Sequence, residues 1–176
     1  MVDANNAWDA ATAMRVGRQI EECDPAWLEE PVVADDTHGL ARVARELQIP
    51  IATGEHEYTK YGARELLELE AADVLQTDVS RCGGVTELLK IGALAQAWNI
   101  PLAPHAMPLV HMHLVSALKG ATTVENLLIW DDVDQRLFVD PPRPSAGVIR
   151  VPERKGLGLS LREDELSRHA TKTIVP

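Results

Sequence analysis

The sequence predicts an α/β protein built as an incomplete TIM-type (β/α) barrel, and three observations predict it. Short apolar runs alternate with helical stretches, as expected for parallel strands joined by helical crossovers. A polar residue follows each apolar run, at intervals of 26, 26, 23, 27 and 20 residues, and barrel enzymes carry their chemistry at the carboxyl ends of strands. The chain has 176 residues, whereas a complete eight-stranded barrel needs roughly 250. We therefore expect the C-terminal six βα units of a barrel followed by a tail.

The elements are expected to alternate strictly along the chain. Pro25 ends the first helical stretch, because proline disfavours helix in the residue before it, and Gly83-Gly84 opens the turn before the fourth. The apolar residues after that turn recur at helical spacing. Helices are predicted over residues 8–23, 37–47, 61–70, 85–92 and 108–118, and strands over residues 1–2, 26–28, 50–53, 73–77, 100–103 and 121–124.

Beyond about residue 126 the sequence changes character. Asp131-Asp132 and the proline-rich residues 141–144 predict loops. Residues 147–152 are predicted as an edge strand, 156–159 as a turn and 162–169 as a final helix. We divide the chain into residues 1–130, a partial barrel carrying the metal and acid/base residues, and residues 131–176, a C-terminal closing segment.

Composition and charge exclude several functions. Lysine and arginine number 17 against 27 acidic residues, which gives a net charge of −10. This balance argues against nucleic acid and anionic membranes as partners, since both attract a basic face. No apolar run reaches about 18 residues, so no membrane span is expected. The first residues lack the basic and apolar regions of a signal peptide. Together with two cysteines that form no framework, this predicts a cytoplasmic chain with reduced thiols.

Asp3, Glu29 and Glu55 follow three successive strands, so a barrel brings their carboxylates to one rim. Three unpaired carboxylates packed together repel each other and their pKa values rise. A divalent cation removes this conflict, and oxygen-only ligands suit Mg²⁺. The alternative for each acid alone is a solvated loop end.

Asp78 and His105 follow the next two strands and should lie side by side. A carboxylate beside an imidazole fixes its tautomer and raises its basicity, as a general acid/base requires. The alternative is a buried histidine bonded to a backbone carbonyl. Glu125 follows the last strand and should face the metal site, where a raised pKa would let it donate a hydrogen bond to a developing oxyanion; its alternative is an exposed acid before a loop.

Several strand-end motifs resemble, in order, those of the enolase superfamily, most closely its mandelate racemase/muconate lactonizing enzyme branch. The motifs are Asp3-Ala4-Asn5, Trp27-Leu28-Glu29-Glu30-Pro31, Thr53-Gly54-Glu55-His56, Thr77-Asp78-Val79-Ser80-Arg81-Cys82-Gly83-Gly84-Val85 and Ala103-Pro104-His105. Gly156-Leu157-Gly158-Leu159 resembles the family's C-terminal closing segment. The resemblance covers nearly the whole chain.

The resemblance implies a role for each matching residue. Asp3, Glu29 and Glu55 match the Mg²⁺ ligands, and Asn5 matches a substrate contact. His105 matches the strand-seven base and Asp78 its partner. Glu125 matches the strand-eight acid that binds the enolate-side oxygen of the substrate. In this family the metal stabilises an enediolate formed when a proton leaves the carbon next to a carboxylate.

Two family features are expected to be absent: the strand-two base motif and the N-terminal capping domain. With only His105 visible as a base, the resemblance favours a sugar-acid dehydratase, in which the same histidine also protonates the leaving hydroxyl. A Glu-His pair at residues 55–56 also resembles sugar-acid dehydratases. The alternatives are a racemase or epimerase of the same superfamily, and a truncated non-catalytic fragment. A small-molecule sugar acid is the expected partner, and unpaired strand edges predict a homo-oligomer or a missing N-terminal portion.

Overall fold

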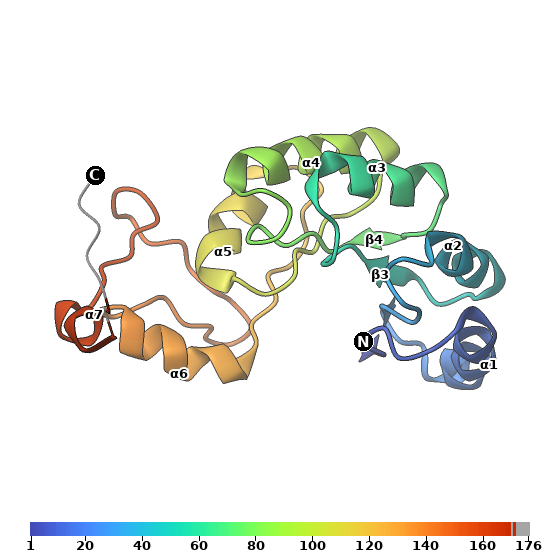
Figure 1. Ribbon diagram of the computed structural model, residues 1–176, viewed down its shortest axis with the longest axis horizontal. Coiled ribbons are helices and arrows are strands. Elements are labelled where there is room, and N and C mark those ends of the chain that lie inside the picture. Colours follow the sequence, from blue (N-terminus) through green and yellow to red (C-terminus); the bar gives the residue numbers. More distant parts are fainter. Residues whose placement is uncertain (170, 172–176) are drawn as a thin grey trace.

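The computed structural model describes residues 1–169 and 171, with short strands and helices in alternation over the first two thirds of the chain (Figure 1). The strands are β1 (Val2–Asp3), β2 (Leu28–Glu29), β3 (Ile51–Thr53) and β4 (Val74–Leu75). The helices are α1 (Ala10–Ile20), the 3₁₀ turn η1 (Glu21–Cys23), α2 (Thr37–Glu46), α3 (Thr59–Glu68), α4 (Val85–Trp98), α5 (Pro108–Ala117), α6 (Leu128–Leu137) and α7 (Glu163–His169).

The sheet is parallel and its strands stand in chain order. The order is β1-β2-β3-β4, with Asp3 opposite Glu29 at the ends of the first two strands. Leu102 extends the sheet by a single parallel bridge to Leu75 and by another to Ala121. The predicted α/β class and strand order are confirmed, although the fifth and sixth strands are reduced to these single bridges.

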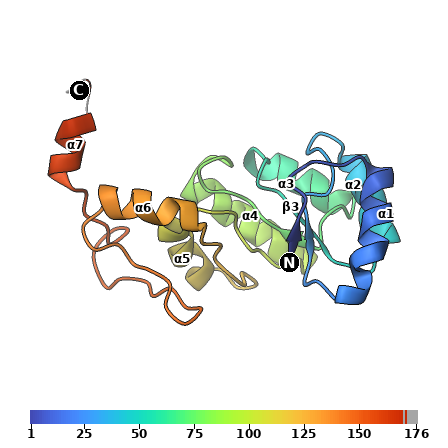
Figure 2. The same cartoon turned by 90° about the horizontal axis from the view of Figure 1, so that it is seen from below.

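Helices α1 to α4 line the outer side of the sheet, and α5 lies next to the last strand positions (Figure 1). Turned by 90°, the molecule shows α6 and α7 at the end opposite α1 (Figure 2). The carboxyl ends of all the parallel strands therefore meet at one edge, where the loops to the helices begin.

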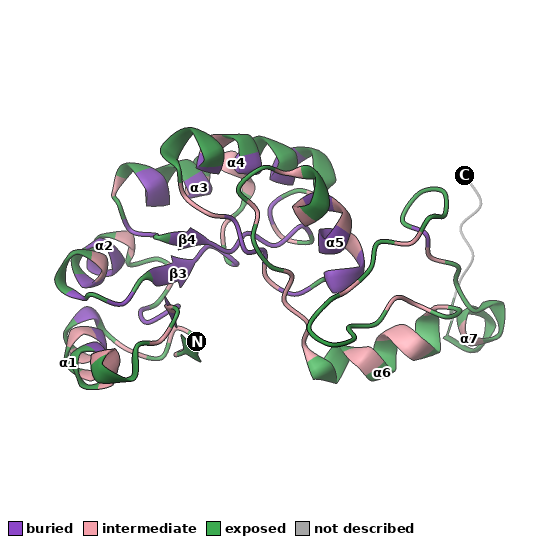
Figure 3. Ribbon diagram, turned by 180° about the vertical axis from the view of Figure 1, so that it is seen from behind, coloured by how far each residue is buried: buried purple, intermediate pink, exposed green. Residues whose placement is uncertain are grey.

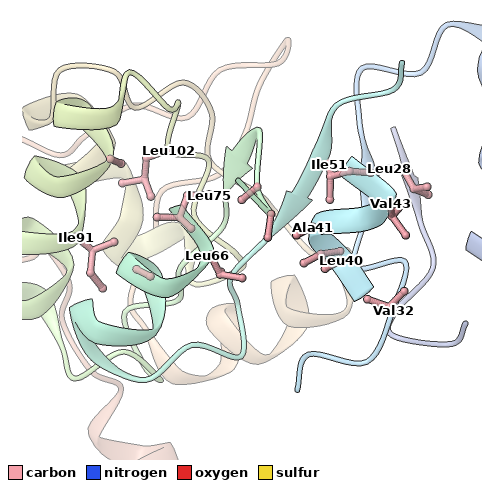
Figure 4. Packing of buried hydrophobic residues seen from close by; sticks show 14 of the residues in the cluster. Leu28, Val32, Leu40, Ala41, Val43, Ile51, Leu66, Leu75, Ile91 and Leu102 are labelled. Atoms are coloured by element: carbon pink, nitrogen blue, oxygen red, sulfur yellow. The ribbon is translucent and has the colours of Figure 1, made fainter. Parts of the chain in front are cut away.

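The core runs along the inner faces of these helices. Leu28, Ile51 and Leu75 are fully buried, one from each of three successive strands, and Leu102 continues the row (Figure 4). Buried residues gather in the strands and the facing helix surfaces, whereas α6 and α7 contain none (Figure 3). A row of large apolar side chains thus fixes the strands that position the polar residues after them.

Local sequence explains how the first crossover helix, α1, begins and how it packs against the end of α2. The Asp9 carboxylate accepts the backbone N–H of Thr12 at 2.7 Å and caps α1, which satisfies a donor that the helix leaves free. Gly17 in α1 faces Leu47, and a Cβ at this glycine would lie 2.3 Å from the leucine Cδ1. The glycine therefore allows α1 to approach the end of α2.

Three expectations beyond the barrel region meet different outcomes. Residues 128–137 form helix α6, so the loop predicted from Asp131-Asp132 is wrong. Asp131 lies in the first turn of this helix, where the positive end of the helix dipole favours an acid. The edge strand over residues 147–152 is also wrong, since this stretch forms only one bridge, from Ser145 to Val148. The final helix is confirmed as α7.

No helix in the described part of the chain is long and apolar enough to cross a membrane. The boundary near residue 130 stays a prediction.

Candidate active site at the carboxyl ends of the strands

The structure places all six predicted strand-end residues at the edge where the loops begin. Asp3 and Glu29 are the last residues of β1 and β2, and Glu55 follows β3 by two positions. Asp78 and His105 follow the next two strand positions, Leu75 and Leu102, by three residues each, and Glu125 follows Ala121 by four. Because the strands are parallel, these six side chains come from one edge of the sheet.

Glu29 is a buried carboxylate among other acids. Its Oε2 accepts the Trp27 indole N–H at 2.9 Å. Burial raises its pKa, hydrogen bonds from Gln76 and Trp27 oppose this, and the negative charges of Asp3 and Glu125 raise it further. The group is thus held close enough to two other acids for their charges to raise its pKa.

Glu30 lies beside Glu29 and is only 2 % exposed. Burial, followed by the charge of Glu55, raises the pKa of Glu30 to about 7, although a hydrogen bond from Asn6 counteracts the rise. One of its oxygens, Oε1, is buried and has no hydrogen-bond partner among residues 1–169 and 171. Such an orphaned buried oxygen is costly unless another donor or a cation satisfies it.

Glu55 lies close to a guanidinium and an imidazole. Its Oε1 accepts from the Arg81 guanidinium at 2.9 Å, and the His56 Nε2 lies 3.6 Å from the same oxygen. The ligand atoms of Glu30, Glu55 and His56 all lie within 4.8 Å of one another. Within the described residues this group is closer than the predicted set of Asp3, Glu29 and Glu55.

The acidic donor set suits a hard divalent cation. Four carboxylates gather here, Glu30 has an orphaned oxygen, and Arg81 pairs directly with only one of them. Oxygen ligands favour Mg²⁺, which commonly keeps some of its waters. The residues present therefore fit such an ion.

His105 and Asp78 form the predicted pair. The His105 Nδ1 lies 2.9 Å from the Asp78 Oδ2, and its Nε2 lies 3.4 Å from the Glu55 Oε2. The other Asp78 oxygen accepts the backbone N–H and the hydroxyl of Ser80, each at 2.7 Å. With Nδ1–H donating to Asp78, the His105 Nε2 presents a lone pair toward the carboxylates.

The electrostatics of the pair favour its charged forms. Burial raises the pKa of Asp78, but hydrogen bonds from His105 and Ser80 outweigh it, so the net direction is downward. Burial lowers the pKa of His105, but the bond to Asp78 and the charges of Glu55 and Glu125 prevail, and the net direction is upward. A histidine with raised basicity facing acids is a group able to take up a proton.

Glu125 is half-buried next to this pair. Its Oε2 accepts the Ala106 backbone N–H at 2.7 Å, and its charge acts on both His105 and Glu29. The carboxylate is thus close enough to act on both the histidine and the acid after β2.

Asn5 lies at the rim of a recess beside the acids. Its backbone N–H donates to the Asp3 Oδ1 at 2.8 Å. The recess has a volume of about 520 Å³, and Asn6, His56 and Tyr58 also line it. A polar recess adjoining the carboxylates has room for a small polar molecule.

A further cavity lies away from the strand ends. It has a volume of about 640 Å³ and apolar walls from α5, α6 and the segment around Leu157. Asp134 is the one acid in its wall; burial, together with the charge of Asp131, raises the pKa of this acid. The other residues lining the cavity are mainly apolar, in contrast to the acids and the His105–Asp78 pair at the strand ends.

Several contacts escaped the sequence analysis. Glu30 was visible as the neighbour of Glu29, but nothing in a one-dimensional pattern indicates that both carboxylates point into the site. Arg81 and Asn6 reach Glu55 and Glu30 across the strand ends. Their sequence distances of 26 and 24 residues match the repeat of the βα units, and that spacing was the available signal.

Parallel strands that end in clustered carboxylates and a His–Asp pair define a class: enzymes on (β/α) barrels that combine a metal with acid/base groups. A family model described as enolase C-terminal domain-like matches residues 1–165. The chain belongs to the enolase superfamily, in its mandelate racemase/muconate lactonizing enzyme branch.

Three named relatives show which kinds of enzyme in this family the chain is similar to. The chain is 37 % identical to an L-rhamnonate dehydratase from Saccharopolyspora erythraea, over 96 % of this chain and 45 % of the relative. An L-talarate dehydratase from Polaromonas sp. JS666, solved with Mg and L-glucarate, superimposes with a TM-score of 0.87 at 38 % identity, over 95 % of this chain and 46 % of that one. A racemase from Streptomyces coelicolor A3(2) with bound magnesium gives a TM-score of 0.88 at 32 % identity, over 96 % and 45 %. The chain spans about half the length of these relatives.

Proposed function

We propose that this chain carries the metal-binding and acid/base residues of a Mg²⁺-dependent sugar-acid dehydratase. The observation that carries the proposal is the His105–Asp78 pair, hydrogen-bonded at 2.9 Å, with the free ring nitrogen 3.4 Å from Glu55 in the carboxylate cluster. The rhamnonate and talarate dehydratases among the relatives support the substrate class.

Asp3, Glu29 and Glu55 would hold the ion, and Glu30 lies close enough to Glu55 to share it. When bound, Mg²⁺ supplies positive charge that offsets the negative charge developing on the substrate carboxylate. Asn5, on the wall of the adjoining recess, contacts the substrate.

The steps assigned to the protein's own groups are a proton removal and a proton delivery. The His105 Nε2 takes the proton from the carbon next to the substrate carboxylate, and Asp78 stabilises the resulting imidazolium. The C–O bond to the β-hydroxyl then breaks. The proton held by His105 goes to the departing oxygen, which leaves as water. The resulting enol then transfers its hydroxyl proton to the β-carbon by tautomerisation, and the product is a 2-keto-3-deoxy acid. Glu125, which lies next to His105, contacts the carboxylate oxygen of the substrate.

The second candidate is a racemase or epimerase, which the magnesium-containing racemase among the relatives favours. Proton removal at the same carbon is common to both reactions. Formation of a 2-keto acid indicates the dehydratase, whereas inversion at that carbon without loss of water indicates the racemase. In either case we propose that residues 1–130 carry the chemistry and residues 131–176 form a closing segment.

The test is α-proton exchange of sugar acids in heavy water, with Mg²⁺ present. We expect His105→Asn to abolish exchange while Mg²⁺ binding, measured by calorimetry, is retained. His113→Asn is the matched control, because His113 lies in α5 and contacts the Leu157 carbonyl rather than the site. Exchange that persists in His105→Asn shows that His105 is not the base. If the wild type and His113→Asn bind Mg²⁺ but exchange no α-protons, the chain is a non-catalytic fragment.

A further inference from the structure

His111 is a fully buried histidine whose two ring nitrogens are both used. Its Nδ1 lies 2.7 Å from the Ala106 carbonyl oxygen, and its Nε2 lies 3.1 Å from the Val79 backbone nitrogen. The Val79 N–H can only donate, so the Nε2 must accept and the proton must reside on Nδ1. The ring is thus neutral and has one defined tautomer.

The two backbone partners of His111 adjoin the acid/base pair. Val79 follows Asp78 after β4, and Ala106 follows His105 after the next strand position. One imidazole therefore connects the two loops. The Asp78–His105 hydrogen bond also joins them, and the backbone N–H of His105 donates to the Gln76 carbonyl at 3.3 Å.

The loop after His105 is strained. Ala106 and Met107 have φ values of 49° and 45°, in the left-handed region that non-glycine residues occupy only when their surroundings impose it. Two side chains impose it here. Glu125 accepts the Ala106 N–H at 2.7 Å, and His111 donates to the carbonyl of the same residue.

We propose that His111 is a positioning residue that holds the Asp78 loop and the strained His105 loop in register, so that the His105 imidazole meets the Asp78 carboxylate. The role rests on the proposed function, since it serves the pair that the function assigns as acid and base. Hydrogen bonds at both ends of one rigid ring fix the separation of the two loops, and misplacement of a reacting group by about 1 Å costs about 10²-fold in rate.

Burial supports a neutral spacer rather than a proton carrier. Burial lowers the pKa of His111, against the bond to Ala106 and the charge of Asp78. No part of the ring faces solvent. The neutral form keeps one donor and one acceptor, which the two loops require.

Two substitutions of His111 each keep one of its hydrogen-bonding functions, and a third removes both. His111→Asn keeps a donor near the Nδ1 position, His111→Gln keeps an acceptor near the Nε2 position, and His111→Leu removes both. His113→Leu is the matched control: the same change in the same helix, at a residue that contacts the Leu157 carbonyl 3.1 Å away instead of the two loops.

The primary measurement is NMR of the 176-residue chain with ring-¹⁵N histidine. We expect the wild type to show His111 as the neutral Nδ1–H tautomer and a downfield His105 Nδ1–H proton bonded to Asp78. The His105 signal should be lost in His111→Leu, be weakened in at least one of the Asn and Gln variants, and stay unchanged in His113→Leu.

Two results would overturn the proposal: a His105 signal of unchanged strength in every folded His111 variant, or an equal loss in His113→Leu. If His111→Leu does not fold, the Asn and Gln variants decide by the same criterion.

Kinetics separate this inference from the proposed function. If the chain exchanges α-protons, His111→Leu should lower kcat by about 10²-fold with little change in KM, because the pair is displaced while substrate contacts remain. If the chain exchanges none, the proposed function fails, yet the NMR result still decides whether His111 positions the pair.

Discussion

Glu30 is predicted to destabilise the metal-free fold at neutral pH, and its replacement by glutamine tests this directly. The carboxyl group is 2 % exposed, and burial beside Glu55 raises its pKa from 4.5 to about 7. Glutamine keeps an oxygen that can accept the Asn6 amide and removes the charge. The variant should therefore be more stable than the wild type wherever Glu30 is ionised in the unfolded chain.

The magnitude follows from the raised pKa. At pH values below 4.5 the group is protonated in both the folded and unfolded states, and it contributes no difference. As the pH rises from 4.5 to about 7, the unfolded chain releases the proton and the folded chain keeps it, so the wild type loses stability. One pKa unit corresponds to about 1.4 kcal/mol, which gives a total loss of about 3 kcal/mol.

The assay is thermal unfolding in EDTA at several pH values from 4 to 8, followed by circular dichroism. For a chain of this size, about 3 kcal/mol corresponds to a Tm difference of about 6–12 °C in favour of Glu30→Gln at pH 8, shrinking toward zero near pH 4. Glu22→Gln, an exposed site in η1, is the control and should shift little at any pH. A difference that stays constant between pH 4 and 8, or a less stable variant at pH 8, would refute the reasoning.

The remaining predictions concern metal, packing and association. Mg²⁺ at about 100 times its Kd should add about 2.7 kcal/mol of stability over EDTA, and Glu29→Gln should abolish that gain; a transition indifferent to Mg²⁺ in the wild type contradicts the site. Gly17→Ala should lower stability by about 1 kcal/mol in urea unfolding, because forcing Leu47 aside costs about 1–3 kcal/mol and exceeds the helix propensity that alanine adds; an unchanged midpoint contradicts this packing. The chain should self-associate in light scattering, since Ile129 on α6 is 79 % exposed among other apolar side chains; a monodisperse monomer contradicts this.

The sequence by itself determined the order of the elements and the edge of the sheet at which the acids and His105 lie. Short apolar runs followed by helices leave few topologies open, because parallel strands need crossovers. The regular placement of Asp3, Glu29 and Glu55 after their strands then located the acids at one edge. The spacing of Asp78 and His105 predicted that they lie side by side, and in the structure they are 2.9 Å apart. These inferences need only the chain direction of each strand.

Tertiary structure decided which groups touch and which carry strain. Glu30 points into the site beside Glu29, and His111 spans two loops although it lies in a helix. Helix α6 formed where Asp131 predicted a loop. Burial and contact depend on how distant segments pack, so they determine pKa values and hydrogen-bond partners that no local pattern contains. The order and direction of the strands follow from the sequence alone, whereas the surroundings of each side chain are set only when the strands and helices pack together.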